Sequence, residues 1–281
     1  MKLKVTLVQF AAGARKEKNV ERASALVEEA AAGGAKFVLL PEVFSFVADA
    51  SLWREAAEEI PGPTSTRLAT LARKHNIHIL AGSILERRGN RRKCSNTSFL
   101  IAPSGDILAR YRKMHLFTVI QPDGVVFDEV HCTLSGDQPA VVETAMGRVG
   151  LTICYDLRFP ELFRVLTLLG AEMITVPSAF TAFTGEAHWK VLLRARAIEN
   201  QVFILAANQT GTAVTGIRFH GHSLVVDPWG TVLAEGSEDE ELVSAEIDTA
   251  RVEEVRSRLG ALRHVRGDLL KRLYQTRPKN H

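Results

Sequence analysis

A cysteine lies at the carboxyl end of an apolar stretch, in a position where a thiol could act as a nucleophile. Residues 149–153 predict a buried strand, Cys154 follows at once, and Pro160 begins an amphipathic helical pattern. Open α/β sheets place their chemistry at such strand-to-helix junctions. The positive end of the helix would favour the thiolate. Read alone, the stretch fits an inert buried cysteine equally well.

Two further reactive residues also follow predicted strands. Glu42 follows the apolar residues 38–41, and Lys113 follows the last hairpin strand of the first half of the chain. Taken singly, the glutamate could cap a helix, and a lysine beside Arg112 is more often a solvated charge. Because strand ends on one edge of a sheet converge, we expect Glu42, Lys113 and Cys154 to lie together.

These three residue types suit the hydrolysis of an amide or nitrile through a thioester. A thiol with an ordinary pKa of about 8.5 is a poor nucleophile at neutral pH. A carboxylate can take its proton, pass it to departing ammonia and then activate the water that opens the thioester. An ammonium would favour the thiolate and stabilise the oxyanion, with a backbone N–H beside the cysteine as the second donor.

The elements that must position these residues are duplicated. Four segments recur in the same order in the second half: 5–9 as 149–153, 34–42 as 170–178, 75–83 as 199–208, and 98–109 as 223–234. Chance produces one such similarity easily, but not four in register. In this alignment Glu42 corresponds to Ser178, so the repeat itself does not require a carboxylate there.

Each half predicts strand, helix, strand, helix, strand, strand, with helices near residues 17–32, 64–75, 160–169 and 187–200. The central strands are continuously apolar, which indicates burial on both faces. We therefore expect an α/β fold, a four-layer α-β-β-α sandwich with an internal pseudo-two-fold duplication, in which residues 1–281 form one domain. From about Asp248 the chain is charged and has no counterpart, so a helix and an irregular tail at a subunit interface are expected.

Composition narrows the class of protein. The chain has 281 residues, of which 46% are hydrophobic and 24% charged, as in ordinary globular proteins. Three cysteines without paired spacing argue for a reducing compartment and against zinc. No signal peptide or membrane-spanning run is apparent, so a cytoplasmic location is expected. The basic run 87–93 contains a Gly-Asn hairpin signal and no aromatic residues, which argues against nucleic-acid binding.

Motifs spread over roughly residues 3–272 resemble the nitrilase superfamily of carbon-nitrogen hydrolases. The chain is most similar to the branch that includes deaminated glutathione amidase and omega-amidase. The motifs that carry this resemblance include Leu-Leu-Pro-Glu-Val-Phe at 39–44, Tyr-Arg-Lys-Met-His-Leu-Phe at 111–117, Cys-Tyr-Asp-Leu-Arg-Phe-Pro-Glu-Leu at 154–162 and Leu-Leu-Arg-Ala-Arg-Ala-Ile-Glu-Asn at 192–200.

The resemblance implies hydrolysis of a small linear omega-amide to a carboxylate and ammonia, without a cofactor or metal. It implies that Glu42 is the general base and acid, Lys113 the oxyanion stabiliser and Cys154 the nucleophile. The amide of Tyr155 would be the second oxyanion donor, and Glu129 would orient Lys113 or the reacting amide. A homodimer or higher homo-oligomer is also expected.

Substrates of this branch give carboxylate products, and Arg158 is the candidate that would bind such a group. A structural ion pair of Arg158 with Asp156 or Glu161 is an equally open alternative. Phe117 and Phe180 are expected to contact substrate, although Phe180 could equally belong to the core. Two loop positions depart from the usual pattern of the branch and leave the exact substrate open: Thr118 and the Ser-Gly pair at 135–136.

Other activities remain compatible with these residues. A nitrilase or an N-carbamoyl-amide hydrolase would use the same triad. A thiol paired with His115 or His188 would resemble papain-like enzymes, but it would leave Glu42 and Lys113 without a use. A catalytically idle binding protein on the same scaffold is a third alternative, although a scaffold alone has no need of all three reactive residues.

Overall fold

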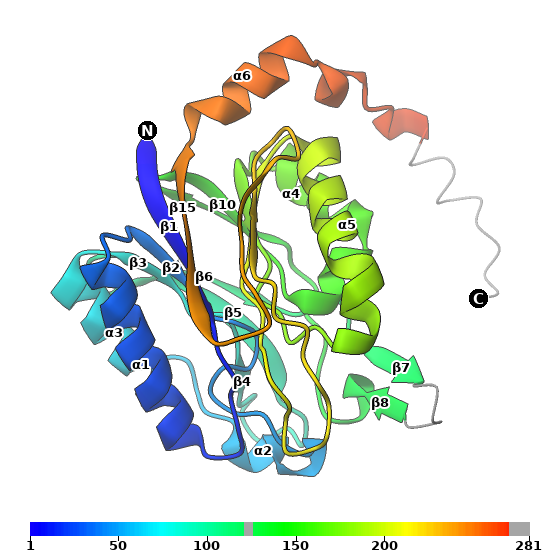
Figure 1. The fold of residues 1–281 in the computed structure, drawn as a ribbon. Coiled ribbons are helices and arrows are strands. Elements are labelled where there is room, and N and C mark those ends of the chain that lie inside the picture. Colours follow the sequence, from blue (N-terminus) through cyan, green and yellow to red (C-terminus); the bar gives the residue numbers. More distant parts are fainter. Residues whose placement is uncertain (121–125, 270–281) are drawn as a thin grey trace.

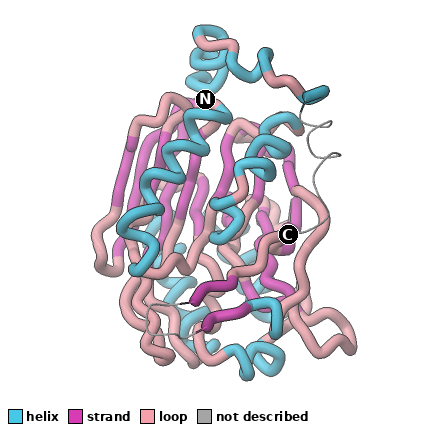
Figure 2. Tube along the Cα trace, turned by 90° about the vertical axis from the view of Figure 1, so that its right-hand side faces the viewer, coloured by secondary structure: helices cyan, strands magenta, loops and turns pink. Residues whose placement is uncertain are grey.

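The computed structural model describes residues 1–120 and 126–269, and these fold into four layers. Two sheets pack face to face, and helices cover the outer face of each sheet (Figures 1 and 2). This is the four-layer sandwich that the apolar strands and the duplication predict. Among the described residues, no helix is long and apolar enough to cross a membrane.

The first sheet has the order β15-β1-β2-β3-β5, and β6 pairs with the other edge of β5. Strands β3 and β4 pair with successive parts of the same edge of β5, so they form one interrupted strand. The strands of this sheet are β1 (Lys2–Gln9), β2 (Phe37–Leu39), β3 (His78–Leu80), β4 (Ile84–Glu86), β5 (Ser95–Ile101), β6 (Ile107–Arg112) and β15 (Glu241–Asp248).

The second sheet has the order β14-β13-β12-β11-β10-β9. A separate two-stranded hairpin is formed by β7 (Thr118–Ile120) and β8 (Val126–Asp128). The strands of the second sheet are β9 (Ala140–Thr144), β10 (Gly147–Leu151), β11 (Met173–Thr175), β12 (Phe203–Ala206), β13 (Leu224–Val226) and β14 (Val232–Glu235).

The strand registers confirm the duplication. In the first sheet Val5 of β1 lies beside Phe37 of β2, and in the second Val149 of β10 lies beside Met173 of β11. These are the residues that the sequence alignment of the two halves makes equivalent. The outer strands complete the correspondence, because β15 pairs antiparallel with β1 as β9 does with β10.

Helices α1 and α3 cover the first sheet, and α4 and α5 cover the second (Figure 1). Three of them match the predicted ranges. The fourth, α5, starts at Ala182 instead of 187, because Gly185 weakens the helical pattern of its first turns. Gly185 is required there, since a Cβ would lie 2.3 Å from the ring of His220. The four helices are α1 (Lys16–Ala32), α3 (Pro63–His75), α4 (Pro160–Leu168) and α5 (Ala182–Asn200).

Short helical turns complete the chain. The predicted C-terminal helix is present as α6, whereas residues 270–281 of the expected tail lie outside the described residues. These elements are η1 (Ala50–Leu52), α2 (Trp53–Ala56), η2 (Glu129–His131), η3 (Cys154–Arg158), α6 (Ala250–Arg258) and η4 (Ala261–His264).

The core lies on both faces of the first sheet, as its apolar strands predict. Along β1, Val5 and Leu7 face the second sheet and pack in one cluster with Leu151, whereas Val8 faces outward and packs in a second cluster with Val27 of α1. Each fully buried side chain of this size contributes about 1.5–3 kcal/mol. Both sheets are therefore fixed relative to each other, and their strand ends hold fixed positions.

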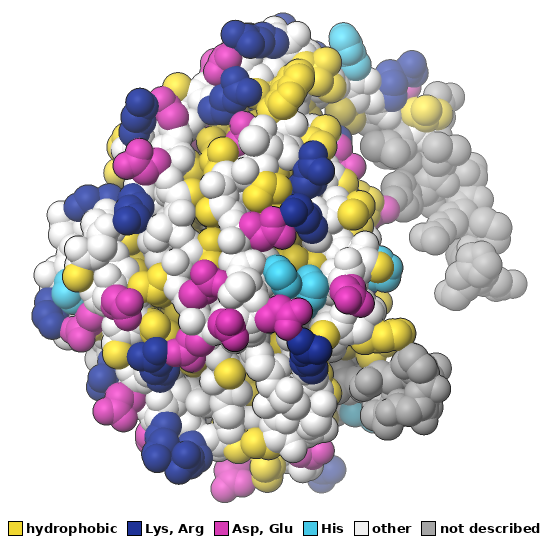
Figure 3. All heavy atoms as spheres, in the orientation of Figure 1, with side chains coloured by type: hydrophobic (Ala, Val, Ile, Leu, Met, Phe, Trp, Pro, Cys, Tyr) yellow, Lys and Arg dark blue, Asp and Glu magenta, His cyan; other side chains and the backbone are white. Residues whose placement is uncertain are grey.

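The surface carries no basic stripe on the face shown in Figure 3, where Lys and Arg side chains are interspersed with Asp and Glu. The basic run 87–93 lies between the antiparallel strands β4 and β5, as the hairpin signal predicts. Gly89 has a φ of 56° there, a backbone conformation that favours glycine.

Candidate active site

Three strand ends bring Glu42, Lys113 and Cys154 together. Glu42 comes shortly after β2, Lys113 directly after β6, and Cys154 begins the turn η3 that follows β10. All three side chains are buried, and all three line one cavity of about 840 Å³. The convergence expected from the sequence is thus present in the structure.

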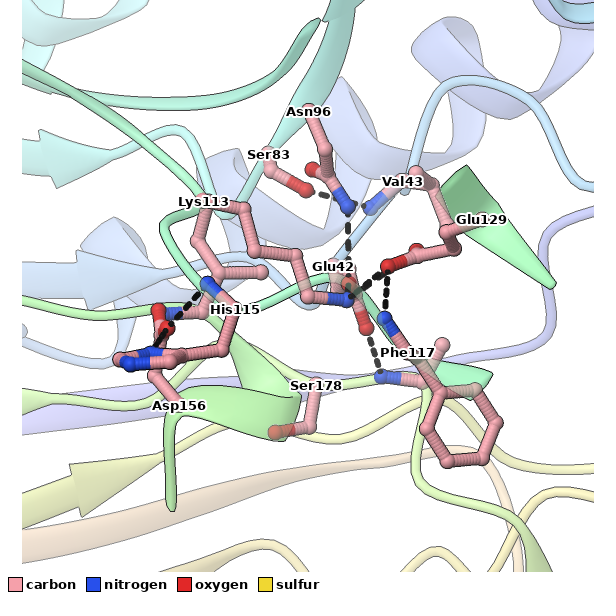
Figure 4. A network of polar contacts seen from close by, with 12 residues as sticks. Glu42, Val43, Ser83, Asn96, Lys113, His115, Phe117, Glu129, Asp156 and Ser178 are labelled. Atoms are coloured by element: carbon pink, nitrogen blue, oxygen red, sulfur yellow. Dashed lines mark hydrogen bonds and ion pairs between the residues drawn. The ribbon is translucent and has the colours of Figure 1, made fainter. Parts of the chain in front are cut away.

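The ammonium of Lys113 lies between two carboxylates (Figure 4). Its Nζ is 2.8 Å from Oε1 of Glu42 and 2.8 Å from Oε2 of Glu129. Burial opposes the charged form, but the negative charges of Glu129 and Glu42 outweigh it and raise the pKa of Lys113 well above its usual range. Burial also raises the pKa of Glu129, against the opposing effect of Lys113. Lys113 is therefore a fixed cation.

The Cys154 thiol lies against the carboxylate of Glu42. Burial, and after it the negative charge of Glu42, raises the pKa of this thiol well above its usual range, although Lys113 acts in the opposite direction. Lys113 thus favours the thiolate as expected, but burial and Glu42 outweigh it, so the neutral thiol is the favoured form. The turn η3 separates Cys154 from the helix α4, which begins only at Pro160. Proton removal by a base must accompany any attack by this thiol.

The backbone at Cys154 is strained. Cys154 has a φ of 45°, in the left-handed region that side chains with a Cβ rarely adopt. The residue after Glu42, Val43, has a φ of 44°, and its amide donates to Oγ of Ser83. Such conformations persist where surrounding structure fixes them, and they concentrate at active sites.

Two residues that the sequence analysis did not identify hold the carboxylate of Glu42. The side-chain amide of Asn96 on β5 donates to Oε1 at 2.8 Å, and the backbone amide of Ala179 donates to Oε2 at 2.8 Å. The backbone oxygen of Asn96 also accepts a hydrogen bond from the backbone amide of Lys113. The sequence signal for Asn96 was its place within an otherwise buried β-strand, because a buried amide side chain needs polar partners.

The amide of Tyr155 is available for a ligand. Among the described residues, no acceptor takes this N–H, whereas the next amide, that of Asp156, donates to Ile153. Tyr155 lines the cavity beside Cys154. A backbone donor next to Cys154 and the ammonium of Lys113 can both stabilise a negative charge that develops at a bound oxygen.

The three predicted substrate contacts, Arg158, Phe117 and Phe180, all lie on the cavity wall. The guanidinium of Arg158 stacks over the rings of Tyr155 and Phe180, at 5.8 and 5.2 Å from their centroids. One of its nitrogens lies 3.2 Å from Nδ1 of His188. Phe180 also packs against Trp189, so it belongs to both the wall and the core.

The alternative partner Asp156 does not pair with Arg158. Its carboxylate is fully buried and accepts from Tyr111 and from His115 instead. His115 is directed at Asp156, and neither it nor His188 is among the residues that line the cavity. The geometry therefore gives no support to a Cys–His pair. No cluster of three or more potential metal-binding side chains occurs in the described part of the chain.

Comparison with known proteins agrees with this geometry. The model of the carbon-nitrogen hydrolase family matches residues 4–257. The chain belongs to this family. A deaminated glutathione amidase of Synechocystis is 42% identical over 249 residues, which cover 88% of this chain and 92% of that protein. The omega-amidase NIT2 of Homo sapiens is 38% identical over 266 residues, covering 95% and 96% of the two chains.

Solved structures give the same result for the fold. The structure of the NitFhit protein of C. elegans superposes with a TM-score of 0.89 at 37% sequence identity. The match covers 95% of this chain but 66% of that longer one. The resemblance to the nitrilase superfamily is thus confirmed, and the chain is a hydrolase of carbon–nitrogen bonds of the amidase type.

Proposed function

We propose that this amidase hydrolyses a small linear amide that carries a carboxylate, through a thioester on Cys154. The main support is the buried arrangement in which Glu42 contacts both the Cys154 thiol and the Lys113 ammonium. A general base, a fixed cation and a nucleophile are the groups that acyl transfer from nitrogen to sulfur requires.

Acylation begins with the neutral thiol. Glu42 takes the thiol proton while Sγ of Cys154 forms a bond to the carbonyl carbon of the amide. The negative charge moves to the substrate oxygen, where Lys113 and the amide of Tyr155 stabilise it. Glu42 then gives its proton to the nitrogen, the carbon–nitrogen bond breaks, and ammonia or an amine leaves.

Deacylation repeats these steps with water. Glu42 takes a proton from a water molecule, whose oxygen attacks the thioester carbon. The same two donors stabilise the second tetrahedral oxyanion, which collapses with cleavage of the carbon–sulfur bond, and the proton returns to Cys154. Glu129 holds the ammonium of Lys113 from the side opposite Glu42 through both steps. Each oxyanion donor typically contributes about 2.7–4 kcal/mol.

Arg158 would bind the substrate carboxylate. It is the only arginine among the described residues that line the cavity, and its stacking on Tyr155 and Phe180 fixes the guanidinium plane for a bidentate contact. The cavity of about 840 Å³ has room for a peptide-like amide as well as for a small omega-amide. Nitriles and N-carbamoyl amines would react at the same three residues, so a panel of all these compounds is needed to identify the substrate.

The nucleophile is tested by trapping. Treatment with iodoacetamide or with a slow substrate should place the adduct on Cys154, as mapped by mass spectrometry, and the loss of activity should follow its formation. Cys154→Ala should be folded and inactive. Activity lost through labelling confined to Cys94 or Cys132 would contradict the proposal.

The role of Arg158 is tested with an omega-amide acid and its neutral methyl ester. The wild type should prefer the acid, and Arg158→Met should lose that preference while it still hydrolyses the ester. Arg218→Met is the matched control, because Arg218 pairs with Glu238 on the surface and does not line the cavity. Loss of both activities with a lower melting temperature would show that Arg158 has a structural role instead.

We also propose that the protein is cytoplasmic and forms a homo-oligomer. Apolar side chains stand exposed along α4, at the residue that follows it and along α5, where a second copy of the chain would cover them: Val165, Leu168, Leu169, Val191 and Ile198. Size-exclusion chromatography with light scattering, on the wild type and on Leu168→Lys, tests this assembly. A monomeric wild type would contradict it.

A further inference from the structure

Asp156, two residues after the proposed nucleophile, is a fully buried carboxylate without a lysine or arginine partner among the described residues. Four donors surround it instead. Its Oδ2 accepts from the hydroxyl of Tyr111 at 2.7 Å and from the amide of Ile153 at 2.8 Å. Its Oδ1 accepts from Nδ1 of His115 at 2.7 Å and from the His115 amide at 3.2 Å.

These donors come from two separate segments of the chain. Tyr111 and His115 flank Lys113, at the end of β6 in the first sheet. Ile153 precedes Cys154, at the end of β10 in the second sheet. One carboxylate therefore joins the segment that carries the Lys113 ammonium to the segment that carries the Tyr155 amide. Figure 4 shows the contact of Asp156 with His115.

We propose that Asp156, with Tyr111 and His115, is a clamp that sets the distance between the two oxyanion donors, Lys113 and the Tyr155 amide. All three are positioning residues, because Tyr111, His115 and Asp156 are not among the residues that line the cavity. The inference rests on the proposed function, because it takes Lys113 and Tyr155 as the donors.

The contacts leave the clamp little freedom. The ring of His115 stacks on Phe159 at 3.6 Å between centroids, with 8° between the planes. The hydroxyl of Tyr111 accepts from the amide of Met114 at 3.2 Å, so it bonds on both sides of its oxygen. Because an ionised carboxylate can only accept, Nδ1 of His115 must carry the proton. A buried carboxylate is costly unless its oxygens are hydrogen-bonded, so each contact stabilises the others.

The geometry required of the clamp follows from the chemistry. Oxyanion donors act when they lie about 2.7–3.1 Å from the charged oxygen of the tetrahedral intermediate. Loosening the clamp would let one donor segment shift relative to the other. An error of about 1 Å can cost about 100-fold in rate. Substrate binding would change little, because the ground-state amide places less charge on its oxygen.

The test uses the full-length enzyme and substitutions in the clamp. Tyr111→Phe and His115→Ala should each lower kcat about 10- to 100-fold with KM nearly unchanged. His115→Asn should restore most of the rate, because the asparagine amide can donate from nearly the position of Nδ1. Asp156→Asn, which places an amide among donors, should lose the most.

A second measurement separates positioning from stability. An aldehyde analogue of the amide forms a tetrahedral adduct with Cys154, and its affinity should fall in proportion to kcat/KM across the clamp variants. Affinity for the amide itself, measured in a Cys154→Ala background, should stay within about threefold of the parent. Val27→Ala, in the outer cluster against α1, is the control for general destabilisation and should leave kcat unchanged.

The outcomes distinguish the clamp from the proposed function. If Tyr111→Phe and His115→Ala lower the melting temperature but not kcat, the clamp is overturned and the proposed mechanism stands. If His115→Asn is as inactive as His115→Ala while Lys113→Met is mild, His115 acts directly on the thiol, and both inferences fail. Restoration of most of the rate by asparagine, together with an inactive Lys113→Met, supports both.

Discussion

The two halves of the chain share one backbone plan but contribute different chemistry. The first sheet supplies the charged groups, Glu42 and Lys113, whereas the second supplies the thiol of Cys154 and the amides of Tyr155 and Ala179. The position equivalent to Glu42 in the second half is Ser178, and the position equivalent to Cys154 in the first half is Phe10.

This difference shows how a duplicated fold builds one site. Because the registers of both sheets agree, equivalent strand ends reach the same edge of the sandwich. The backbone frame is therefore shared, and single substitutions at strand ends decide which half carries the carboxylate and which carries the thiol. Ser178 bonds to the backbone oxygen of Val176, which is a local contact, while Glu42 bonds to groups of both halves.

The largest expected effect compares the equivalent positions Glu42 and Ser178. Glu42→Gln should lower kcat by several orders of magnitude. The pKa of Cys154 is raised, so the thiol needs a base to lose its proton, and the substitution removes that base. Ser178→Ala should change kcat less than about threefold, since it loses one neutral hydrogen bond. Steady-state kinetics on both variants check the comparison, and equal losses would contradict it.

A double variant tests whether the two charged residues of the first half, Glu42 and Lys113, act together. Lys113→Met should also lower kcat by several orders of magnitude, and combining it with Glu42→Gln should add little, because the two residues act as a unit. Strictly additive losses would show that the two groups act independently of each other.

An intermediate effect is expected at Asn96, which holds Glu42 from β5. Asn96→Leu should lower kcat about 10- to 100-fold, since a hydrogen bond to a charged group is worth about 1.5–3 kcal/mol. Ser98→Ala on the same strand is the matched control, because its buried hydroxyl has no partner among the described residues. Comparable losses in both variants would point to a general disturbance of β5.

The last prediction concerns stability instead of activity, at Cys94, a buried thiol of the first half that lies outside the candidate site. Burial raises the pKa of Cys94 to about 11, whereas an unfolded thiol ionises at about 8.5. Between these values the folded state keeps a proton that the unfolded state releases, so the free energy of unfolding falls as pH rises. The contribution is complete below about pH 8.5 and is lost by about pH 11, at a cost of up to about 3 kcal/mol.

Urea unfolding of the wild type and of Cys94→Ala between pH 8 and pH 11 measures this contribution. The wild type should lose stability more steeply than the variant over that range, while both keep their activity at neutral pH. Parallel slopes would show that Cys94 ionises alike in the folded and unfolded chains.

Much of the fold was predictable from the sequence, for a physical reason. Apolar runs such as residues 37–40 and 149–153 can be buried on both faces only between two layers, and the repeated order of segments determined how the strands are arranged. The start of α5 was not predictable, because Gly185 is explained by the ring of His220, which comes from a distant segment.

The sequence by itself determined which residues carry reactive groups and that three of them end strands. The tertiary structure decided the ionisation state and the contacts of these groups. Burial beside Glu42 keeps the thiol of Cys154 neutral, against the expectation of a thiolate, because the cost of desolvating a charge depends on everything packed around it. The contacts of Asn96 and Asp156 were likewise decided only by folding, since their partners are distant in sequence. Asn96 meets Glu42 within the first sheet, whereas Asp156 meets Tyr111 where the two sheets join.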